Sequence, residues 1–218
     1  MFLAIILGYI LMIPVHKTLV LATHNSHKKS EIKMILSDLN INVVGLDQFP
    51  QIGEIEETGT TLTENSLLKA RTVYEFTGLP CLADDTGLEV KSLNGAPGVY
   101  SARYAGNDAT FLDNINKIMD ELNKLDDLER FAIFRTVLSL VDEKTEITKE
   151  GSVEGEITRS LIGDHGFGYD PIFKPKGFSI TYGEMTDQQK NKISHRAVAL
   201  KNMKDVLIKH FKKGGIIE

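Results

Sequence analysis

The sequence predicts an α/β fold, because segments with strand character alternate with segments of helical periodicity. Residues 18–22 and 42–46 are short apolar or β-branched runs, and each precedes a stretch whose apolar residues recur at helical spacing. With 218 residues the chain can bury a sizeable core, as one large domain or as two lobes of one domain. We therefore expect a single α/β domain over residues 18–212, followed by a tail at residues 213–218.

The first half of the chain contains two strand–helix pairs. A polar turn at residues 23–28 separates the first strand from an amphipathic helix, whose apolar face is Ile32, Ile35, Leu36 and Leu39. The second helix follows the strand at residues 42–46 and an acidic loop. Thr61 and Glu64 fit a capping box at its start, and Gly78 ends it.

A third apolar run, residues 80–83, is predicted to be a buried strand that ends at Asp84 and Asp85. Open α/β sheets place ligands beyond the carboxyl ends of their strands, so this acidic pair indicates a metal site. A solvated turn closed by Gly87 is the alternative interpretation. Residues 88–90 are expected to form a separate short strand.

The next part of the chain predicts a helix and a long hairpin. The helix covers about residues 110–124, and the two strands cover residues 131–141 and 147–157. Gly151 and Gly155 lie inside the second strand, where isolated glycines indicate bulges.

The last part contains a glycine-rich loop at residues 163–169 and a segment at residues 170–173 that is expected to be extended. The final helix begins after Ser194, which is a natural N-cap. This start places His195 and Arg196 in the first helical turn.

Composition argues against several classes of protein. A formal net charge of −5 gives no basic face for general binding to nucleic acid or to a membrane surface. The single cysteine, Cys81, cannot form an internal disulfide, and its apolar surroundings indicate a buried structural thiol. We therefore expect a reducing compartment and a cytoplasmic protein.

Residues 1–15 are almost wholly apolar, yet they lack a cationic start and a cleavage site and are too short to span a bilayer. A membrane anchor is the alternative interpretation. We expect residues 1–17 to be an extension outside the domain, and Met12 is an alternative start of the chain.

Two of four separated segments carry charge for phosphate and metal. Residues 23–28 offer a hydroxyl, an amide and a lysine where a helix begins, which suits a triphosphate, although a plain helix cap explains them equally well. Glu56 and Glu57, together with Asp84 and Asp85, are oxygen ligands without clustered Cys or His, which favours Mg²⁺ over zinc. A solvated acidic loop is the alternative for the glutamates.

The other two segments carry groups that suit a base. Residues 166–171 place glycines around two aromatic rings, so that backbone can approach a flat ligand while a ring stacks on it. His195 and Arg196 can donate hydrogen bonds to carbonyl oxygens or phosphates. The alternatives are a buried aromatic turn and a helix start with solvated charges.

Taken together, these segments resemble the ITPase or Ham1-like family, the dITP/XTP pyrophosphatases that act on non-standard purine nucleoside triphosphates. The resemblance runs from about Thr18 to Leu207. The motifs that carry it, in chain order, are residues 22–28, 57–59 with 64–65, 83–88, 95–98, 166–171 and 194–196. Their order is far more specific than any one of them.

The resemblance implies an elongated mixed central sheet flanked by helices, with two lobes around a nucleotide-binding cleft and a homodimeric assembly. It also implies Mg²⁺-dependent hydrolysis of dITP, ITP and XTP to the monophosphate and pyrophosphate, which keeps such nucleotides out of DNA and RNA. The expected partner is thus a purine nucleoside triphosphate, with neither nucleic acid nor membrane.

The resemblance also assigns roles to residues. Glu57 and Asp85 match the metal-binding carboxylates, and Asp85 also matches the proposed proton acceptor, so whether it acts as base or mainly as ligand stays open. The positions that match triphosphate contacts are Thr23, His24, Asn25, Ser26, His27, Lys28 and Lys190. Those that match other substrate contacts are Thr86, Phe167, Gly168, Tyr169 and Asp170, with His195 and Arg196 at positions that read the oxygenated edge of the purine.

Two positions depart from the family pattern. His24 stands where the family often has a small residue, and Thr86 stands where bacterial members commonly have serine. Thr86 keeps the hydroxyl, whereas His24 can either crowd the phosphates or point outward. Two other functions also fit parts of the pattern: a Maf-type pyrophosphatase that prefers other nucleotides, and a non-catalytic nucleotide-binding or RNA-binding module.

Overall fold

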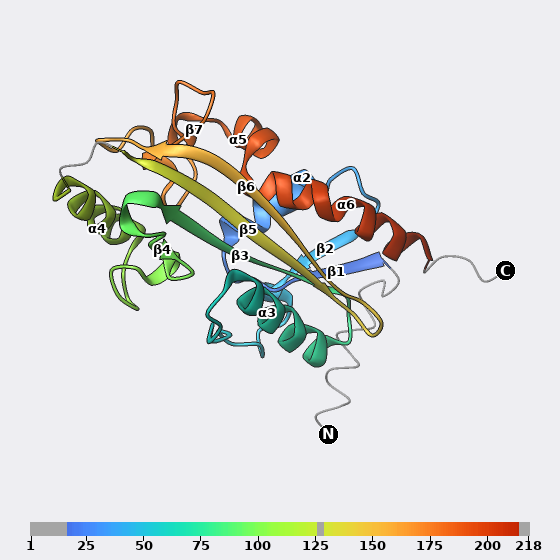
Figure 1. Ribbon diagram of the computed structural model, residues 1–218. Coiled ribbons are helices and arrows are strands. Elements are labelled where there is room, and N and C mark those ends of the chain that lie inside the picture. The colour runs from blue at the N-terminus through green and yellow to red at the C-terminus, as the bar shows by residue number, and fades with distance from the viewer. Residues whose placement is uncertain (1–16, 126–128, 214–218) are drawn as a thin grey trace.

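A mixed sheet forms the centre of the molecule in the computed structural model, which describes residues 17–125 and 129–213 (Figure 1). Within these residues the sheet has seven strands in the order β2-β1-β3-β5-β6-β7, and β4 pairs with β3 off this path. The strands are β1 (Thr18–Leu21), β2 (Asn42–Gly45), β3 (Cys81–Val90), β4 (Pro97–Gly98), β5 (Phe131–Val141), β6 (Glu146–Ile157) and β7 (Phe173–Pro175). The predicted mixed α/β class is confirmed.

Helices cover both faces of this sheet. They are α2 (Ser26–Ile35), α3 (Leu62–Thr77), α4 (Phe111–Asn123), α5 (Asp187–Ile193) and α6 (His195–Lys213). Alternate residues of β1 divide between the faces: Leu19 packs with Ile32 of α2 and Met203 of α6, whereas Val20 packs with Val73 of α3. A third hydrophobic cluster joins α4 to the far ends of the long strands. Apolar residues are thus clustered at both ends of the molecule, with two clusters at the end of β1 and one at the end of α4.

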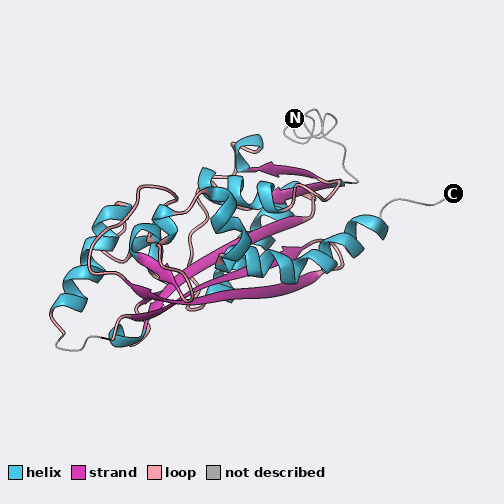
Figure 2. Ribbon diagram, turned by 90° about the horizontal axis from the view of Figure 1, so that it is seen from above, coloured by secondary structure: helices cyan, strands magenta, loops and turns pink. Residues whose placement is uncertain are grey.

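The long hairpin is confirmed. β5 and β6 pair antiparallel from Phe131↔Glu156 to Val141↔Glu146, and Figure 2 shows that these strands run most of the length of the molecule. The predicted bulges are wrong, because the register is one-to-one through Gly151 and Gly155. Gly151 instead allows a close approach: a Cβ there would lie 2.2 Å from the Ala199 nitrogen and 2.4 Å from the His195 oxygen of α6.

Several predicted helix ends are confirmed. Thr61 and Glu64 form a capping box on α3, which ends at Gly78 with a φ of 65°. Ser194 accepts a hydrogen bond from the Ala197 nitrogen at 3.2 Å, so α6 begins where its N-cap predicts. Helix α2 ends at Ile35, earlier than expected.

One short segment differs from its prediction, and one helix was not foreseen. Residues expected to be extended form a 3₁₀ turn at Asp170–Ile172, which Pro171 favours at its start, before β7 begins at Phe173. Helix α5, which carries Lys190, was not predicted from the sequence.

Strand β3 is longer than predicted, and this is the largest difference between the structure and the prediction. It does not end at Asp84 and Asp85, and the separate strand at residues 88–90 is its continuation. β5 pairs with every residue of β3 from Cys81 to Val90, and this ladder carries the strand past the two aspartates.

The other edge of β3 is open at its centre. β1 pairs with it only at Cys81 and Leu82, and β4 pairs with it only at Leu88 and Glu89. In the described part of the chain, residues 83–87 thus have a strand partner on the β5 side alone. The two aspartates lie beyond the carboxyl end of β1 rather than that of β3.

Cys81 is fully buried, as predicted, and burial raises the pKa of its thiol. Among the described residues no helix is long and apolar enough to cross a bilayer. Residues 1–16 of the predicted extension (1–17) and residues 214–218 of the predicted tail (213–218) lie outside the described residues, so the predicted division of the chain stays a prediction.

Candidate active site

Asp84 and Asp85 point to opposite faces of the sheet, because neighbouring side chains of a strand alternate. On the face of α2 and α6, Asp84 lies 3.2 Å from the Lys28 ammonium and 2.9 Å from Arg196. On the face of α3, Asp85 lies 2.8 Å from the Lys69 ammonium. The open edge of β3 brings these two groups of charges to one place in the molecule.

A buried ionic network holds the groups on the Asp84 face. Arg196 donates to Asp84 and also to Glu31 of α2. Lys190 donates to Glu31 at 2.7 Å and to Asp170 at 2.6 Å. Burial alone would raise the pKa of Asp84, but Lys28 and Arg196 outweigh it and hold that pKa well below its usual range. Asp84 is therefore held in its charged form.

Glu31 is the member of this network that the sequence analysis missed. It lies one helical turn after Lys28 and is 7 % exposed. Burial raises the pKa of Glu31, but the charges and hydrogen bonds of Arg196 and Lys190 outweigh this, so its pKa lies below the usual value. Glu31 thus stays ionised and fixes two cations that face the cavity described below.

The lowered pKa of Glu31 predicts an acid-sensitive contribution to stability. A carboxyl whose folded pKa is depressed stabilises the protein above its unfolded pKa, and this stabilisation is lost as the pH falls through the folded value. We expect Glu31→Gln to lower the melting temperature at pH 7 and to lower it less at pH 3, because at pH 3 the unfolded chain is protonated at Glu31 and part of the stabilisation from the depressed pKa is lost. Thermal unfolding followed by circular dichroism at both pH values measures this difference.

The matched control is Glu154→Gln, which removes an exposed carboxylate paired with Lys176 on the sheet surface. Its effect should be small at both pH values. An equal loss of melting temperature for Glu31→Gln at pH 7 and pH 3 would contradict the ionised network.

On the α3 face, Lys69 joins the two predicted metal-binding carboxylates. Its ammonium donates to Glu57 at 2.6 Å and to Asp85 at 2.8 Å, and Arg103 donates to the other Glu57 oxygen at 3.2 Å. Burial raises the pKa of Asp85 to about 6, with Lys69 opposing the rise and Glu57 adding to it. Glu56, by contrast, is exposed, as the solvated-loop interpretation expects.

The oxygen donors here fit a hard divalent cation. The second Asp85 oxygen, Oδ2, is buried and has no hydrogen-bond partner. The described residues contain no group of three or more His, Cys, Asp or Glu side chains arranged around a common point. Mg²⁺ needs only one or two protein carboxylates when substrate phosphates and water complete its shell, so Glu57 and Asp85 are the residues that would hold it.

A cavity of about 100 Å³ opens at this edge on the face of the sheet where Asp84 lies. Ten of the predicted site residues line it: Asn25, Lys28, Thr86, Phe167, Gly168, Tyr169, Asp170, Lys190, His195 and Arg196. This volume is smaller than the roughly 300–1,000 Å³ of typical small-molecule sites.

Aromatic rings fill much of the cavity wall. The Phe167 ring stacks on the His27 ring at 5.2 Å between centroids, and the Lys190 ammonium lies 4.7 Å from the Phe167 centroid. His195 stacks on Phe134 at 4.2 Å, and burial lowers its pKa well below the usual value, so the imidazole is neutral. The buried Nδ1 atom of His195 has no hydrogen-bond partner.

Several predicted contacts serve the local structure. The Asn25 side chain accepts hydrogen bonds from the nitrogens of His27 and Lys28, and so caps α2, as the alternative interpretation expects. The Thr23 hydroxyl accepts from the Asn25 nitrogen at 3.1 Å. His24 donates from Nε2 to the Gly53 oxygen at 3.1 Å, so it points toward the loop before Glu57.

The remaining predicted residues take different places. Asp170 accepts from the Phe167 nitrogen at 2.8 Å and thereby fixes the glycine-rich loop. The Tyr169 hydroxyl donates to the Ser101 oxygen at 2.8 Å. Ser26 and His27 are exposed at the start of α2 and do not line the cavity.

Sequence reasoning also missed Lys69, Arg103 and Phe111. Lys69 lies between Asn65 and Val73 at helical spacing, on the buried face of α3. A lysine on such a face predicts a buried acidic partner, which was the available signal. Arg103 and Phe111 carry no comparable signal in the sequence alone.

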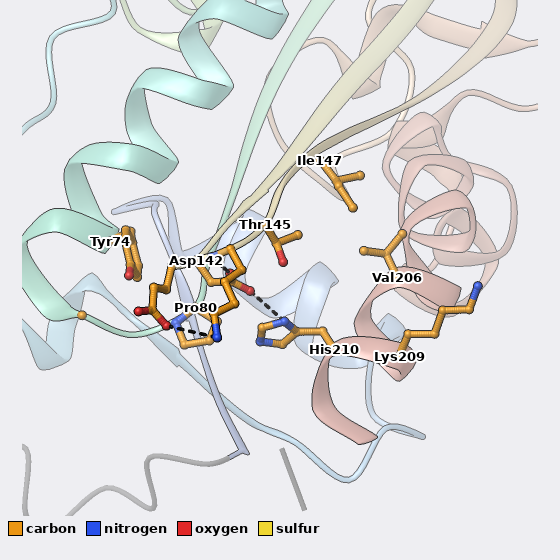
Figure 3. A pocket seen from close by; sticks show the side chains of 11 residues that line it. Tyr74, Pro80, Asp142, Thr145, Ile147, Val206, Lys209 and His210 are labelled. Carbon is orange, nitrogen blue, oxygen red and sulfur yellow. Dashed lines mark hydrogen bonds and ion pairs between the residues drawn. The ribbon is translucent and has the colours of Figure 1, made fainter. Parts of the chain in front are cut away.

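A larger cavity, of about 720 Å³, lies at the opposite end of the sheet (Figure 3). It is bounded by Tyr74 and Pro80 on one side, by Val206 and Lys209 of α6 on the other, and by an ion pair between Asp142 and His210 at 2.8 Å. None of the predicted site residues lines it. We therefore place the candidate active site at the smaller cavity and the open edge of β3.

Comparisons with known proteins show which family this chain resembles. A sequence model described as the Ham1 family matches residues 19–206. The chain is 45 % identical to a dITP/XTP pyrophosphatase of Porphyromonas gingivalis over 87 % of its own length and 97 % of that protein. It is similar to the solved structure of a HAM1 protein from Coxiella burnetii, with a TM-score of 0.81, 43 % identity and coverage of 88 % and 99 % of the two chains. The Staphylococcus aureus Ham1 structure gives a TM-score of 0.78 at 36 % identity, with coverage of 88 % and 99 %.

Proposed function

Since the chain belongs to the Ham1 family, we propose that it hydrolyses dITP, XTP and ITP to the nucleoside monophosphate and pyrophosphate. The observation that carries this proposal is the meeting of two charged groups at the open edge of β3. Carboxylates suited to metal and water lie on one side, and cations suited to phosphate line a cavity on the other.

The reaction needs water to attack the α-phosphorus while pyrophosphate leaves. Lys28 and Lys190 line the cavity and supply fixed positive charge to the phosphate oxygens. Asp85 has one oxygen on Lys69 and the other free, so it can orient the attacking water or hold a metal ion. No covalent nucleophile is required.

Mg²⁺ is the proposed cofactor, and Glu57 and Asp85 are the residues that would hold it. When bound, Mg²⁺ neutralises phosphate charge and acidifies water. Lys69 lies between the two carboxylates and holds them close to one another. The two carboxylates are therefore already close together without a bound ion.

Selection of the base is assigned to His195 and Arg196. His195 lines the cavity and has an unpartnered, buried ring nitrogen, and the Arg196 guanidinium is fixed by Asp84 and Glu31. A purine with O6 can accept a hydrogen bond from such donors, whereas the exocyclic amine of adenine leaves a buried donor unpaired.

The test is incubation with dITP and Mg²⁺, with pyrophosphate and orthophosphate measured separately. We expect pyrophosphate without orthophosphate, and faster turnover of dITP, ITP and XTP than of dATP, dTTP or UTP. A preference for dTTP and UTP would instead indicate the Maf-type activity. Tight binding of dITP without any release of pyrophosphate would indicate a binding module.

The remaining parts of the proposal concern the protein in the cell. We assign it to removal of non-standard purine nucleotides before they enter DNA or RNA, in the cytoplasm and as a homodimer. The buried, reduced Cys81 supports a reducing compartment. Light scattering at micromolar concentration tests the dimer.

A further inference from the structure

We propose that Phe111 is a second aromatic contact for the purine base, beside Phe167. This inference rests on the proposed function, because it needs a purine ligand in the cavity. It adds an aromatic contact from the start of α4 to a cavity that residues of α2, β3, β5, α5, α6 and the glycine-rich loop also line.

The position of Phe111 is unusual for a large apolar side chain. It is 49 % exposed, yet it lines the cavity together with Phe167, Lys190 and Arg196. Single exposed apolar residues are common on protein surfaces and need no explanation by themselves. The place of this ring at the mouth of the cavity is what indicates a role.

The Phe111 and Phe167 rings form two adjoining parts of the cavity wall. Their centroids lie 6.2 Å apart and their planes are inclined by 46°, within the range of aromatic contact. The His27 ring covers one face of the Phe167 ring, so a flat base would stack on the other face and meet the Phe111 ring at an angle. Both contacts remove apolar surface of the base from water.

The backbone that carries Phe111 is held firmly. Phe111 is the first residue of α4, and the reciprocal hydrogen bonds of Thr110 and Asp113 form a capping box there. One turn later, Asn114 accepts from the Ala105 nitrogen at 2.7 Å and donates to the Ala102 oxygen at 3.2 Å. The ring is thus presented from a fixed helix start, so little order is lost when a base binds.

The neighbouring residue provides a matched control. Leu112 is 53 % exposed and lies in the same helical turn, but it does not line the cavity. Truncating either side chain removes an exposed apolar group from the start of α4. Only Phe111→Ala should remove a contact with the base.

The experiment compares Phe111→Ala and Leu112→Ala with the wild type. We expect Phe111→Ala to raise the KM for dITP by about 5- to 30-fold, the lower part of the range for base–aromatic stacking, with kcat within about twofold. Leu112→Ala should leave both constants unchanged, and Phe111→Tyr should restore KM because it keeps the ring. Binding of inosine monophosphate, measured by calorimetry without metal, should weaken by the same factor.

These outcomes separate this inference from the proposed function. If the wild type hydrolyses dITP but Phe111→Ala and Leu112→Ala have the same KM, the role of Phe111 is wrong and the activity stands. If the wild type neither hydrolyses dITP nor binds inosine monophosphate, the proposed function itself fails. Equal melting temperatures of the variants show that the helix start is intact.

Discussion

Replacement of Asp85 by asparagine is expected to lower the rate of pyrophosphate release from dITP by roughly 10²- to 10⁴-fold. The change removes the charge that would hold a metal ion or take a proton from water, while it keeps the shape of the side chain. The fold should survive, because Lys69 keeps its ion pair with Glu57. Burial also raises the pKa of Asp85, so a neutral side chain relieves a buried charge.

The matched control is Asp38→Asn, which removes an exposed aspartate paired with Lys204 far from the cavity. Release of pyrophosphate in the presence of Mg²⁺, and the melting temperature, are measured for both variants. Near-normal hydrolysis of dITP by Asp85→Asn would remove Asp85 from the mechanism. A large fall in its melting temperature would show that the residue is mainly structural.

Replacement of Arg196 by methionine is expected to destabilise the protein by about 3–5 kcal/mol, the cost of breaking a buried ion pair from one side. Arg196 is 1 % exposed, and its guanidinium pairs with both Asp84 and Glu31. Without it, Asp84 keeps the Lys28 ammonium at 3.2 Å and the Thr86 hydroxyl at 3.3 Å, and Glu31 keeps Lys190. Urea unfolding with a comparison of m-values measures the loss.

A double-mutant cycle sharpens this prediction. Glu31→Gln combined with Arg196→Met should cost less than the sum of the single changes, because Glu31→Gln removes one of the two carboxylates that lose a partner in Arg196→Met. Arg71→Met, which breaks an exposed pair with Glu146, serves as the surface control and should have a much smaller effect. Additive losses in the cycle would contradict the coupling of Glu31 with Arg196.

Local signals in the sequence predicted much of the fold. The capping box at Thr61 and Glu64, the N-cap at Ser194 and the hairpin of β5 and β6 are all set by residues close in the chain, and all were confirmed. The end of β3 was mispredicted, because polar residues interrupt its apolar pattern. What continues the strand is its ladder with β5, a partner about fifty residues away that local periodicity does not reveal.

The site shows the same division. Glycines and charges in contiguous motifs indicated ten residues that line one cavity. Lys69 and Glu31 were missed because they sit within helices among ordinary helical residues. Their partners Asp85 and Arg196 are 16 and 165 positions away, so only the folded chain shows that their charges are paired.

The open edge of β3 also leaves part of the main chain facing the site. The oxygens of Pro80 and Leu82 accept hydrogen bonds from Val20 and Ala22 on this edge, and peptide groups alternate along a strand. The peptide groups of Asp84 and Thr86 therefore point into the gap between β1 and β4. Substitutions of side chains leave these backbone donors and acceptors in place. A variant that no longer catalyses the reaction can therefore still bind a phosphate or a ribose.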